Sequence, residues 1–133
     1  MAQNKIVIRY LSGRILKGFT SDFFPNKDVF HIISDDEPGS KAKEVRVAEL
    51  KAIFFVKDPA GNPKHEELKA FDPATPIVGR KIRVLFKDGE VLLGTTQGYQ
   101  PNRPGFFVTP ADPKSNNERC FVVSAATREV SFL

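Results

Sequence analysis

Hydrophobic and polar residues alternate in short stretches along the whole chain. In the first stretch, Ile6, Ile8 and Tyr10 alternate with Val7 and Arg9. A period of two residues is typical of a β-strand with one buried face. The stretches end in glycine, proline, asparagine or aspartate, which favour turns. The pattern therefore predicts short strands joined by turns and loops, with little helix.

The alternating pattern occurs twice, at a constant offset of 76 residues. Lys5–Gly13 aligns with Lys81–Gly89 without a gap, and the glycines, aromatic residues and loop residues that follow also align. The matched pairs are Leu16 with Leu92, Gly18 with Gly94, Thr20 with Thr96, Phe23 with Tyr99, Pro25-Asn26 with Pro101-Asn102, and Phe30 with Phe106. We interpret this as an internal duplication.

Each copy is expected to contain five strands. Gly13 and Gly89 predict hairpin turns after the first strand, and Gly18 and Gly94 predict a bend in the second. A polar loop, 34–43 or 110–119, separates the third strand from the fourth. Val45 and Val47 mark the fourth strand of the first copy, and Phe121 and Val123 mark that of the second. One helical turn and a one-residue shift in register precede the fifth strand.

This pattern predicts an all-β fold of two tandem five-stranded small barrels, closed or nearly closed. The barrels cover residues 1–56 and 81–133, and residues 57–80 form an ordered, proline-containing linker with a short helix at 63–70. A copy of this size is marginally stable alone, so we expect the barrels to pack together. The outward apolar residues expected at this contact are Val7, Phe54, Val56, Leu85, Phe107 and Val122.

Composition limits the function classes without identifying one. The 133 residues are 41% hydrophobic and 27% charged, with a net charge of +4. The positive excess is +2 in each copy and no run of Lys or Arg occurs, so the sequence shows no clustered basic face for phosphates. No apolar run is long enough to span a membrane, no signal segment is visible, and a single cysteine forms no internal disulfide. We expect a cytoplasmic protein without membrane contact.

Part of the pattern resembles a known family. Lys87-Asp88-Gly89 followed by Gly94 resembles the first half of the Sm-like fold, in which glycines turn and bend the first two strands. The resemblance implies Sm-like or SH3-like barrels, ring assembly and RNA binding. The loop after the second glycine has a different spacing here, and the later Arg-Gly signature is absent. The stretch from Asp88 to Val123 also resembles an uncharacterised bacterial family of paired barrels, which implies no activity.

Few residues suggest catalysis. His31 aligns with Phe107 at an outward strand position, and His65 lies beside Glu66 and Glu67 at the start of a helix. Cys120 aligns with Glu44, which is also an outward position, and it has no activating neighbour. Adjacent residues on a helix point in different directions, so His65 and the two glutamates do not form a metal-binding set. We therefore expect no enzymatic activity, no metal and no cofactor.

Two groups of residues are candidates for binding. The equivalent loops after the second strand place amides and cations beside aromatic rings, a combination that suits stacking of single-stranded bases. The candidates there are Phe24, Asn26, Lys27, Tyr99, Asn102 and Arg103. A polar loop adds Asn116, Asn117 and Arg119. For the first group we favour turn chemistry and solubility as the explanation, and for the second an ordinary surface loop.

The hypothesis that follows is a non-enzymatic interaction or regulatory module that binds a protein partner. The alternative is an Sm-like protein that binds RNA or another single-stranded nucleic acid. A sensor of a small molecule or nucleotide ranks third, and homo-oligomers remain compatible with the sequence.

Overall fold

The structure is a computed structural model of the whole chain, and it describes residues 4–24, 27–34, 42–56, 79–99, 103–111 and 117–133. These residues form ten strands and two single turns of 3-10 helix. The strands are β1 (Asn4–Tyr10), β2 (Ile15–Thr20), β3 (Val29–Ser34), β4 (Lys43–Arg46), β5 (Leu50–Val56), β6 (Arg80–Phe86), β7 (Val91–Thr96), β8 (Gly105–Pro110), β9 (Asn117–Val123) and β10 (Thr127–Phe132); the turns are η1 (Val47–Glu49) and η2 (Ser124–Ala126).

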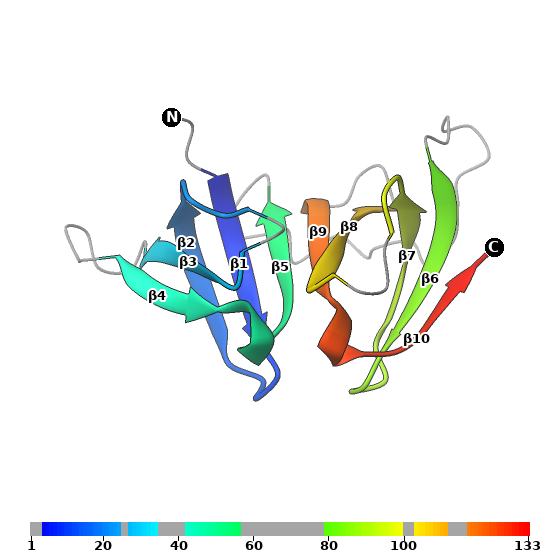
Figure 1. Cartoon of the computed structure of the whole chain (residues 1–133), viewed down its shortest axis with the longest axis horizontal. Helices are drawn as coiled ribbons and strands as arrows, with labels where there is room; N and C mark the ends of the chain where they lie inside the picture. Colours follow the sequence, from blue (N-terminus) through cyan, green and yellow to red (C-terminus); the bar gives the residue numbers. More distant parts are fainter. Residues whose placement is uncertain (1–3, 25–26, 35–41, 57–78, 100–102, 112–116) are drawn as a thin grey trace, which may run out of the picture.

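All ten strands belong to one antiparallel sheet with the order β10-β6-β7-β8-β9-β5-β1-β2-β3-β4. The all-β class is therefore confirmed. The two tandem five-stranded barrels, predicted to be closed or nearly closed, are not confirmed, because β4 and β10 lie at the two ends of this order and the sheet is not closed. The physical reason is visible in Figure 1: β5 and β9 lie side by side at the centre, so each copy continues into the other instead of closing on itself.

The second copy repeats the strand pairings of the first. Ile6 faces Gly18 across β1 and β2, and Ile82 faces Gly94 across β6 and β7, at the offset of 76 residues. From the fourth strand onward the offset is 77, because Phe30 faces Val45 whereas its counterpart Phe106 faces Val122. The one-residue shift thus precedes the fourth strand, not the fifth. Val122, not Phe121, takes the place of Val45.

The hairpin turns form as predicted. The backbone N–H of Gly13 donates to the carbonyl of Tyr10, and the N–H of Gly89 donates to that of Phe86. Gly13 and Gly89 have φ angles of 94° and 95°, values that glycine adopts without the steric cost of a side chain. A three-residue loop that ends in such a residue is a common connection between antiparallel strands.

The third strand of each copy turns a corner in the sheet. The first residues of β3 pair with β4, and only its last two pair with β2. A buried threonine ties this corner in both copies: the hydroxyl of Thr20 donates to the carbonyl of His31 at 2.7 Å, and that of Thr96 donates to Phe107 at 2.8 Å. The two bonds are equivalent in the repeat, which identifies them as part of the fold.

The junction between the copies has an aromatic core. The ring of Phe23 lies 5.0 Å from Phe121, 5.7 Å from Phe55 and 6.2 Å from Phe107, measured between centroids. Phe107 and Phe121 belong to the second copy, so they complete the core of the first. Edge-to-face ring pairs at these distances add to the stabilisation from buried area.

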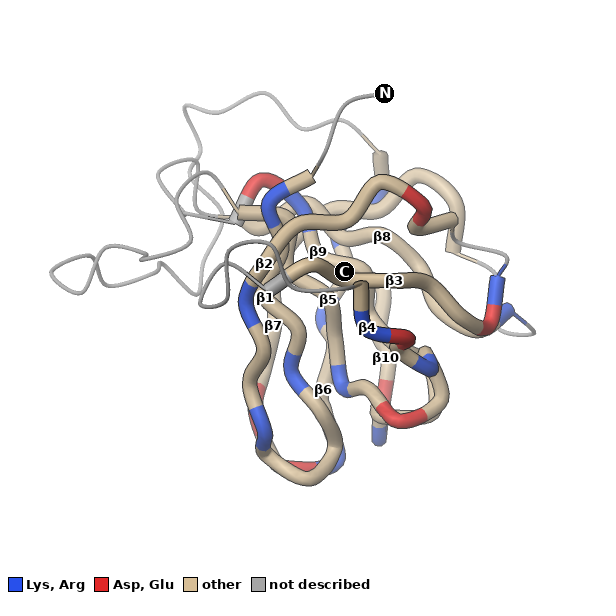
Figure 2. The backbone as a smooth tube through the Cα atoms, turned by 90° about the vertical axis from the view of Figure 1, so that its left-hand side faces the viewer, with Lys and Arg blue, Asp and Glu red and all other residues tan. Residues whose placement is uncertain are grey.

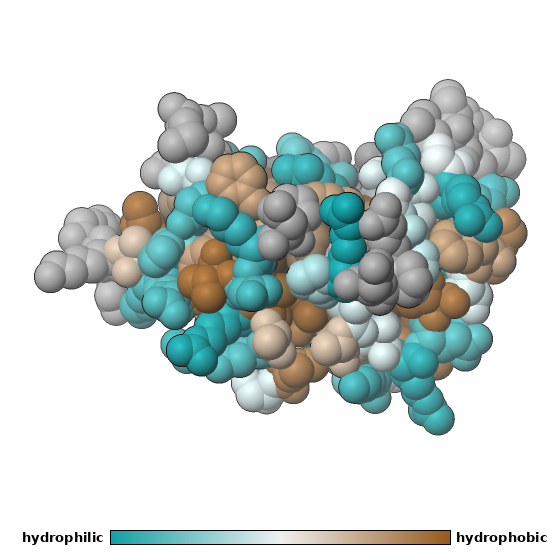
Figure 3. All heavy atoms as spheres, in the orientation of Figure 1, coloured by the Kyte–Doolittle hydropathy of each residue, from teal (hydrophilic) through white to brown (hydrophobic). Residues whose placement is uncertain are grey.

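β9 is buried on both faces along residues 120–123, since it pairs with β5 on one side and β8 on the other. Cys120, expected at an outward position, is fully buried opposite Phe54. The strand begins at Asn117, so Asn117 and Arg119 lie in β9 and not in the polar loop that the sequence predicted. Figure 3 shows the outer surface on one side, where hydrophobic residues form small patches among hydrophilic ones.

The linker assigned to residues 57–80 lies outside the described residues up to 78, and Arg80 already belongs to β6. The short helix predicted at 63–70 also lies outside them. Basic and acidic residues are interspersed over both copies, as Figure 2 shows.

Candidate functional site

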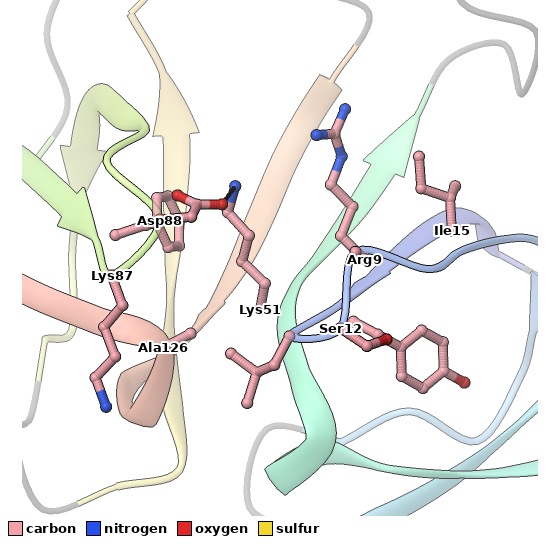
Figure 4. A pocket seen from close by; sticks show the side chains of 11 residues that line it. Arg9, Ser12, Ile15, Lys51, Lys87, Asp88 and Ala126 are labelled. Carbon is pink, nitrogen blue, oxygen red and sulfur yellow. Dashed lines mark ion pairs between the residues drawn. The ribbon is translucent and has the colours of Figure 1, made fainter.

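A cleft of about 430 Å³ lies where the two copies meet. We call it the junction cleft; its lining residues are Arg9, Tyr10, Leu11, Ser12, Gly13, Ile15, Lys51, Phe86, Lys87, Asp88 and Ala126. The β1–β2 hairpin forms one wall, and the β6–β7 hairpin with η2 forms the other (Figure 4). Equivalent turns of the repeat thus face one another across this cleft.

Lys51 crosses from β5 to the hairpin of the second copy. Its Nζ lies 2.7 Å from Oδ2 of Asp88 and 3.0 Å from Oε1 of Glu90, and Figure 4 shows the side chain reaching toward Asp88. Only 8% of the Lys51 side chain is exposed. The ammonium also lies 4.7 Å from the centroid of Phe86. A buried charge needs such partners, so Lys51 fixes the second hairpin against β5.

The carboxylate of Asp88 accepts hydrogen bonds from Lys51 and from the backbone of Glu90. The hydrogen bond from Lys51 holds the pKa of Asp88 below its ordinary value of 3.8, and the backbone N–H of Glu90 adds to the effect. That N–H donates to Oδ1 of Asp88 at 3.0 Å. Asp88 therefore remains ionised under mildly acidic conditions and serves both the turn and the ion pair.

Two aliphatic side chains flank the junction cleft. Leu11 and Ile15 are 53% and 51% exposed, although both line the cleft. Arg9 and Lys87 are exposed cations on opposite walls. The cleft thus combines an apolar edge with two exposed cations, beside a cluster of Lys51, Asp88 and Glu90 whose net charge is −1.

A second cleft, also of about 430 Å³, lies beside the corner of the second copy. We call it the arginine cleft; it is lined by Thr95, Thr96, Gln97, Gly98, Arg103, Gly105, Phe106, Phe107, Thr109, Arg119 and Phe121. It opens where β7 and β8 diverge, because these strands pair only at Gly94–Pro110 and Thr95–Thr109. The guanidinium of Arg119 lies 4.4 Å from the centroid of Phe55 and 4.6 Å from that of Phe107.

Among the described residues, the structure brings predicted site residues together in two pairs: Arg103 and Arg119 both line the arginine cleft, and Lys27 lies beside Phe24. Tyr99 is half-buried, and its ring centroid lies 4.8 Å from that of Phe106 and 5.4 Å from that of Phe132.

On the equivalent loop of the first copy, Phe24 is exposed and the Nζ of Lys27 lies 4.9 Å from its ring centroid. Asn26, Asn102 and Asn116 lie outside the described residues, and Asn117 is placed only as part of the β9 backbone.

His31 is an exposed strand residue held by one carboxylate. Its Nδ1 lies 2.7 Å from Oδ2 of Asp22, and its backbone N–H donates to Oδ1 at 2.9 Å. Partial burial raises the pKa of Asp22, but the hydrogen bonds from the backbone and the ring of His31 outweigh burial and lower it overall. Within the described part of the chain, no three His, Cys, Asp or Glu side chains gather in a way that could hold a metal ion.

Lys51 is a residue of the junction cleft that the sequence pattern did not single out. A signal was present: Lys51 follows Leu50 and precedes the apolar run Ala52–Val56, and a lysine inside a buried strand requires a partner. Its partners come from a hairpin almost 40 residues further along the chain. The pairing becomes apparent only once β5 and the second copy are placed together.

The fold and the two clefts define an all-β protein built from a duplicated five-strand unit. Its sequence matches the family of unknown function DUF6982 over residues 2–133, so the chain belongs to that family. No curated protein and no solved structure matches the chain significantly. In the described residues, no helix has the length and apolar character needed to cross a membrane.

Proposed function

We propose that this protein is a non-enzymatic interaction module, built from two Sm-like or SH3-like units, that binds a protein partner at the junction cleft. The observation that carries the proposal is the exposure of Leu11 and Ile15 beside a cleft to which both copies contribute. Exposed apolar side chains at a hollow are typical of interaction sites, whereas single exposed apolar residues need no explanation.

The chemistry of the cleft suggests the kind of partner segment that fits. An apolar side chain of the partner would cover Leu11 and Ile15, and an acidic residue beside it would face Arg9 or Lys87. The charge of Lys51 is already paired with Asp88 and Glu90, so Lys51 joins the two walls of the cleft and does not itself bind the partner. The cleft therefore offers the exposed cations Arg9 and Lys87 to an acidic residue of the partner.

Affinity capture from cells that contain the natural partners tests the proposal. The parent is compared with the double variant Leu11→Ser, Ile15→Ser. The matched control is Ile33→Ser, Leu133→Ser, which removes two side chains that are 38% and 65% exposed and do not line the junction cleft. About half of each of the Leu11 and Ile15 side chains is exposed and would be buried by the partner. We therefore expect each serine to reduce the binding free energy by about 1 kcal/mol, which makes binding by the double variant at least about tenfold weaker.

The expected result is a stoichiometric polypeptide that the parent and the control retain and the cleft variant loses. Equal retention by all three proteins contradicts the proposal. Retention of RNA instead of protein, with a steep loss between low and moderate salt, would support the alternative of a single-strand-binding protein.

A further inference from the structure

The arginine cleft has a different chemistry from the junction cleft. Its described lining includes two arginines and no acidic residue, together with aromatic rings and hydroxyl groups. Its volume of about 430 Å³ falls in the range of small-molecule sites. We propose that the arginine cleft binds a small anion with a planar body, of the size of a nucleoside monophosphate. This site is separate from the one proposed for a protein partner.

Arg119 is positioned in advance to receive the anion. Phe55 and Phe107 both contact its guanidinium, and cation–π contacts of this kind restrict the side chain. Little conformational freedom is then lost on binding. No ion pair joins Arg119 to a carboxylate among the residues that the structure describes. A guanidinium that is held by aromatic rings and not by a carboxylate can donate two parallel hydrogen bonds to a phosphate or carboxylate of a ligand.

The rest of the cleft suits the body of such a ligand. Phe107 and Phe121 provide apolar wall, and Thr95 and Thr109 face one another across β7 and β8. Their hydroxyls can donate to or accept from polar edges of a ring system. The hydroxyl of Thr96 is already used, because it donates to the carbonyl of Phe107.

The first copy shows that the fold alone does not produce this site. By the strand pairings, Gly98 corresponds to Asp22, Phe107 to His31, and Arg119 to Ala42. In the first copy the Asp22 carboxylate binds the ring and backbone of His31. The equivalent place in the first copy therefore carries the Asp22 carboxylate and has alanine where the second copy has Arg119, while Lys27 corresponds to Arg103. Among the described residues, the contact of an arginine with two aromatic rings at this corner is therefore a feature of the second copy.

Titration calorimetry on the full chain tests the proposal with adenosine 5′-monophosphate as the probe. Adenosine and inorganic phosphate, titrated separately, report on the planar body and the anion. The variants are Arg119→Gln, which removes the guanidinium, and Gly98→Asp, which introduces the carboxylate of the first copy. A Cβ at Gly98 meets no atom within 4 Å, so the second variant keeps the fold. Arg128→Gln removes one exposed positive charge outside the cleft as a control.

We expect saturable binding of adenosine 5′-monophosphate that both cleft variants weaken about tenfold, the typical effect of losing a charge-assisted hydrogen bond. Arg128→Gln should bind as the parent does, and adenosine should bind more weakly. Thermal melts must show that each variant is folded. Absence of binding to the parent overturns the proposal, as does an equal loss in all three variants. Binding of a deoxyadenosine hexamer without binding of the mononucleotide also overturns it, in favour of a single-strand groove.

Discussion

A methyl group added at Gly94 is expected to destabilise the corner of the second copy. Gly94 lies in β7 opposite Pro110 and is buried. A Cβ at this position would overlap the carbonyl oxygen of Thr109 and come within 2.6 Å of Cγ1 of Val108. Real Cβ atoms essentially never approach other atoms this closely, and the backbone oxygen cannot rotate away. The φ angle of Gly94 is not positive, so crowding and not backbone strain is the cause.

The cost follows from the geometry. Overpacking a well-packed site costs typically about 1–3 kcal/mol, and Gly94→Ala should lie in the upper half of that range because backbone must move. Gly94→Val should cost more. For a chain of this size about 1 kcal/mol corresponds to roughly 3–5 °C in Tm, so the alanine variant should melt roughly 6–15 °C below the parent. The repeat adds a second case, since a Cβ at Gly18 would overlap the carbonyl of Ile33.

Circular dichroism melts of Gly94→Ala, Gly18→Ala and Gly98→Ala are the assay. Gly98 is the control: it lies near the same corner, but a Cβ there meets open space. Alanine at such a position often stabilises slightly, by restricting the unfolded chain. If Gly94→Ala melts together with Gly98→Ala, the close approach of β7 and β8 does not explain the glycine. A variant with the parental Tm that loses a binding activity would assign Gly94 to recognition instead.

Two further predictions concern carboxylates that are paired with a cation or a histidine. The double variant Asp88→Asn, Glu90→Gln should lower the urea midpoint more than Lys51→Met does. The double variant leaves a buried ammonium unpaired, whereas Lys51→Met leaves two carboxylates that are 55% and 44% exposed. A larger loss for Lys51→Met contradicts the role given to the lysine. Asp22 and Asp88 both have a lowered pKa in the folded state. The stability that they contribute to the folded state is therefore complete above the ordinary pKa of 3.8 and disappears as the pH falls through the lower folded pKa. Urea midpoints measured between pH 6 and pH 2.5 should decline below about pH 4, and Asp88→Asn should reduce that decline.

Local sequence signals predicted the strands well. The period of two, the glycine turns and the single helical turn are all encoded within a few residues, and β1, β2 and their counterparts begin and end close to the predicted positions. The structure follows the constant offset up to β3 and β8. Such features depend on neighbours in the chain, so one sequence is enough to reveal them.

Features that depend on distant contacts were not predictable in the same way. The pairing of β5 with β9 joins segments more than 60 residues apart, and no local pattern encodes it. The open sheet depends on that pairing, so the local pattern could not show whether each copy closes into a barrel. The position of the one-residue shift was ambiguous because all of Cys120–Val123 are apolar. A strand buried on both faces shows no alternation from which its register could be determined.

The duplicated strands differ in the way that their places in the sheet require. β9 lies inside the sheet, and its residues Cys120, Phe121 and Val123 correspond to Lys43, Glu44 and Arg46 on β4. β4 lies at one end of the sheet, where its outer edge has no partner strand among the described residues. Charged side chains on an edge strand oppose pairing with another chain.

At the other end of the sheet, β10 corresponds to β5, and Arg128 and Glu129 replace Lys51 and Ala52. If β10 of one chain paired with β4 of a second as β5 pairs with β9, Val130 would lie opposite Glu44, where the internal contact has Ile53 opposite Phe121. The apolar pair that holds the junction would become an apolar residue against a carboxylate, at a cost in desolvation. The substitutions between the copies therefore favour the contact within one chain and disfavour its repetition between chains.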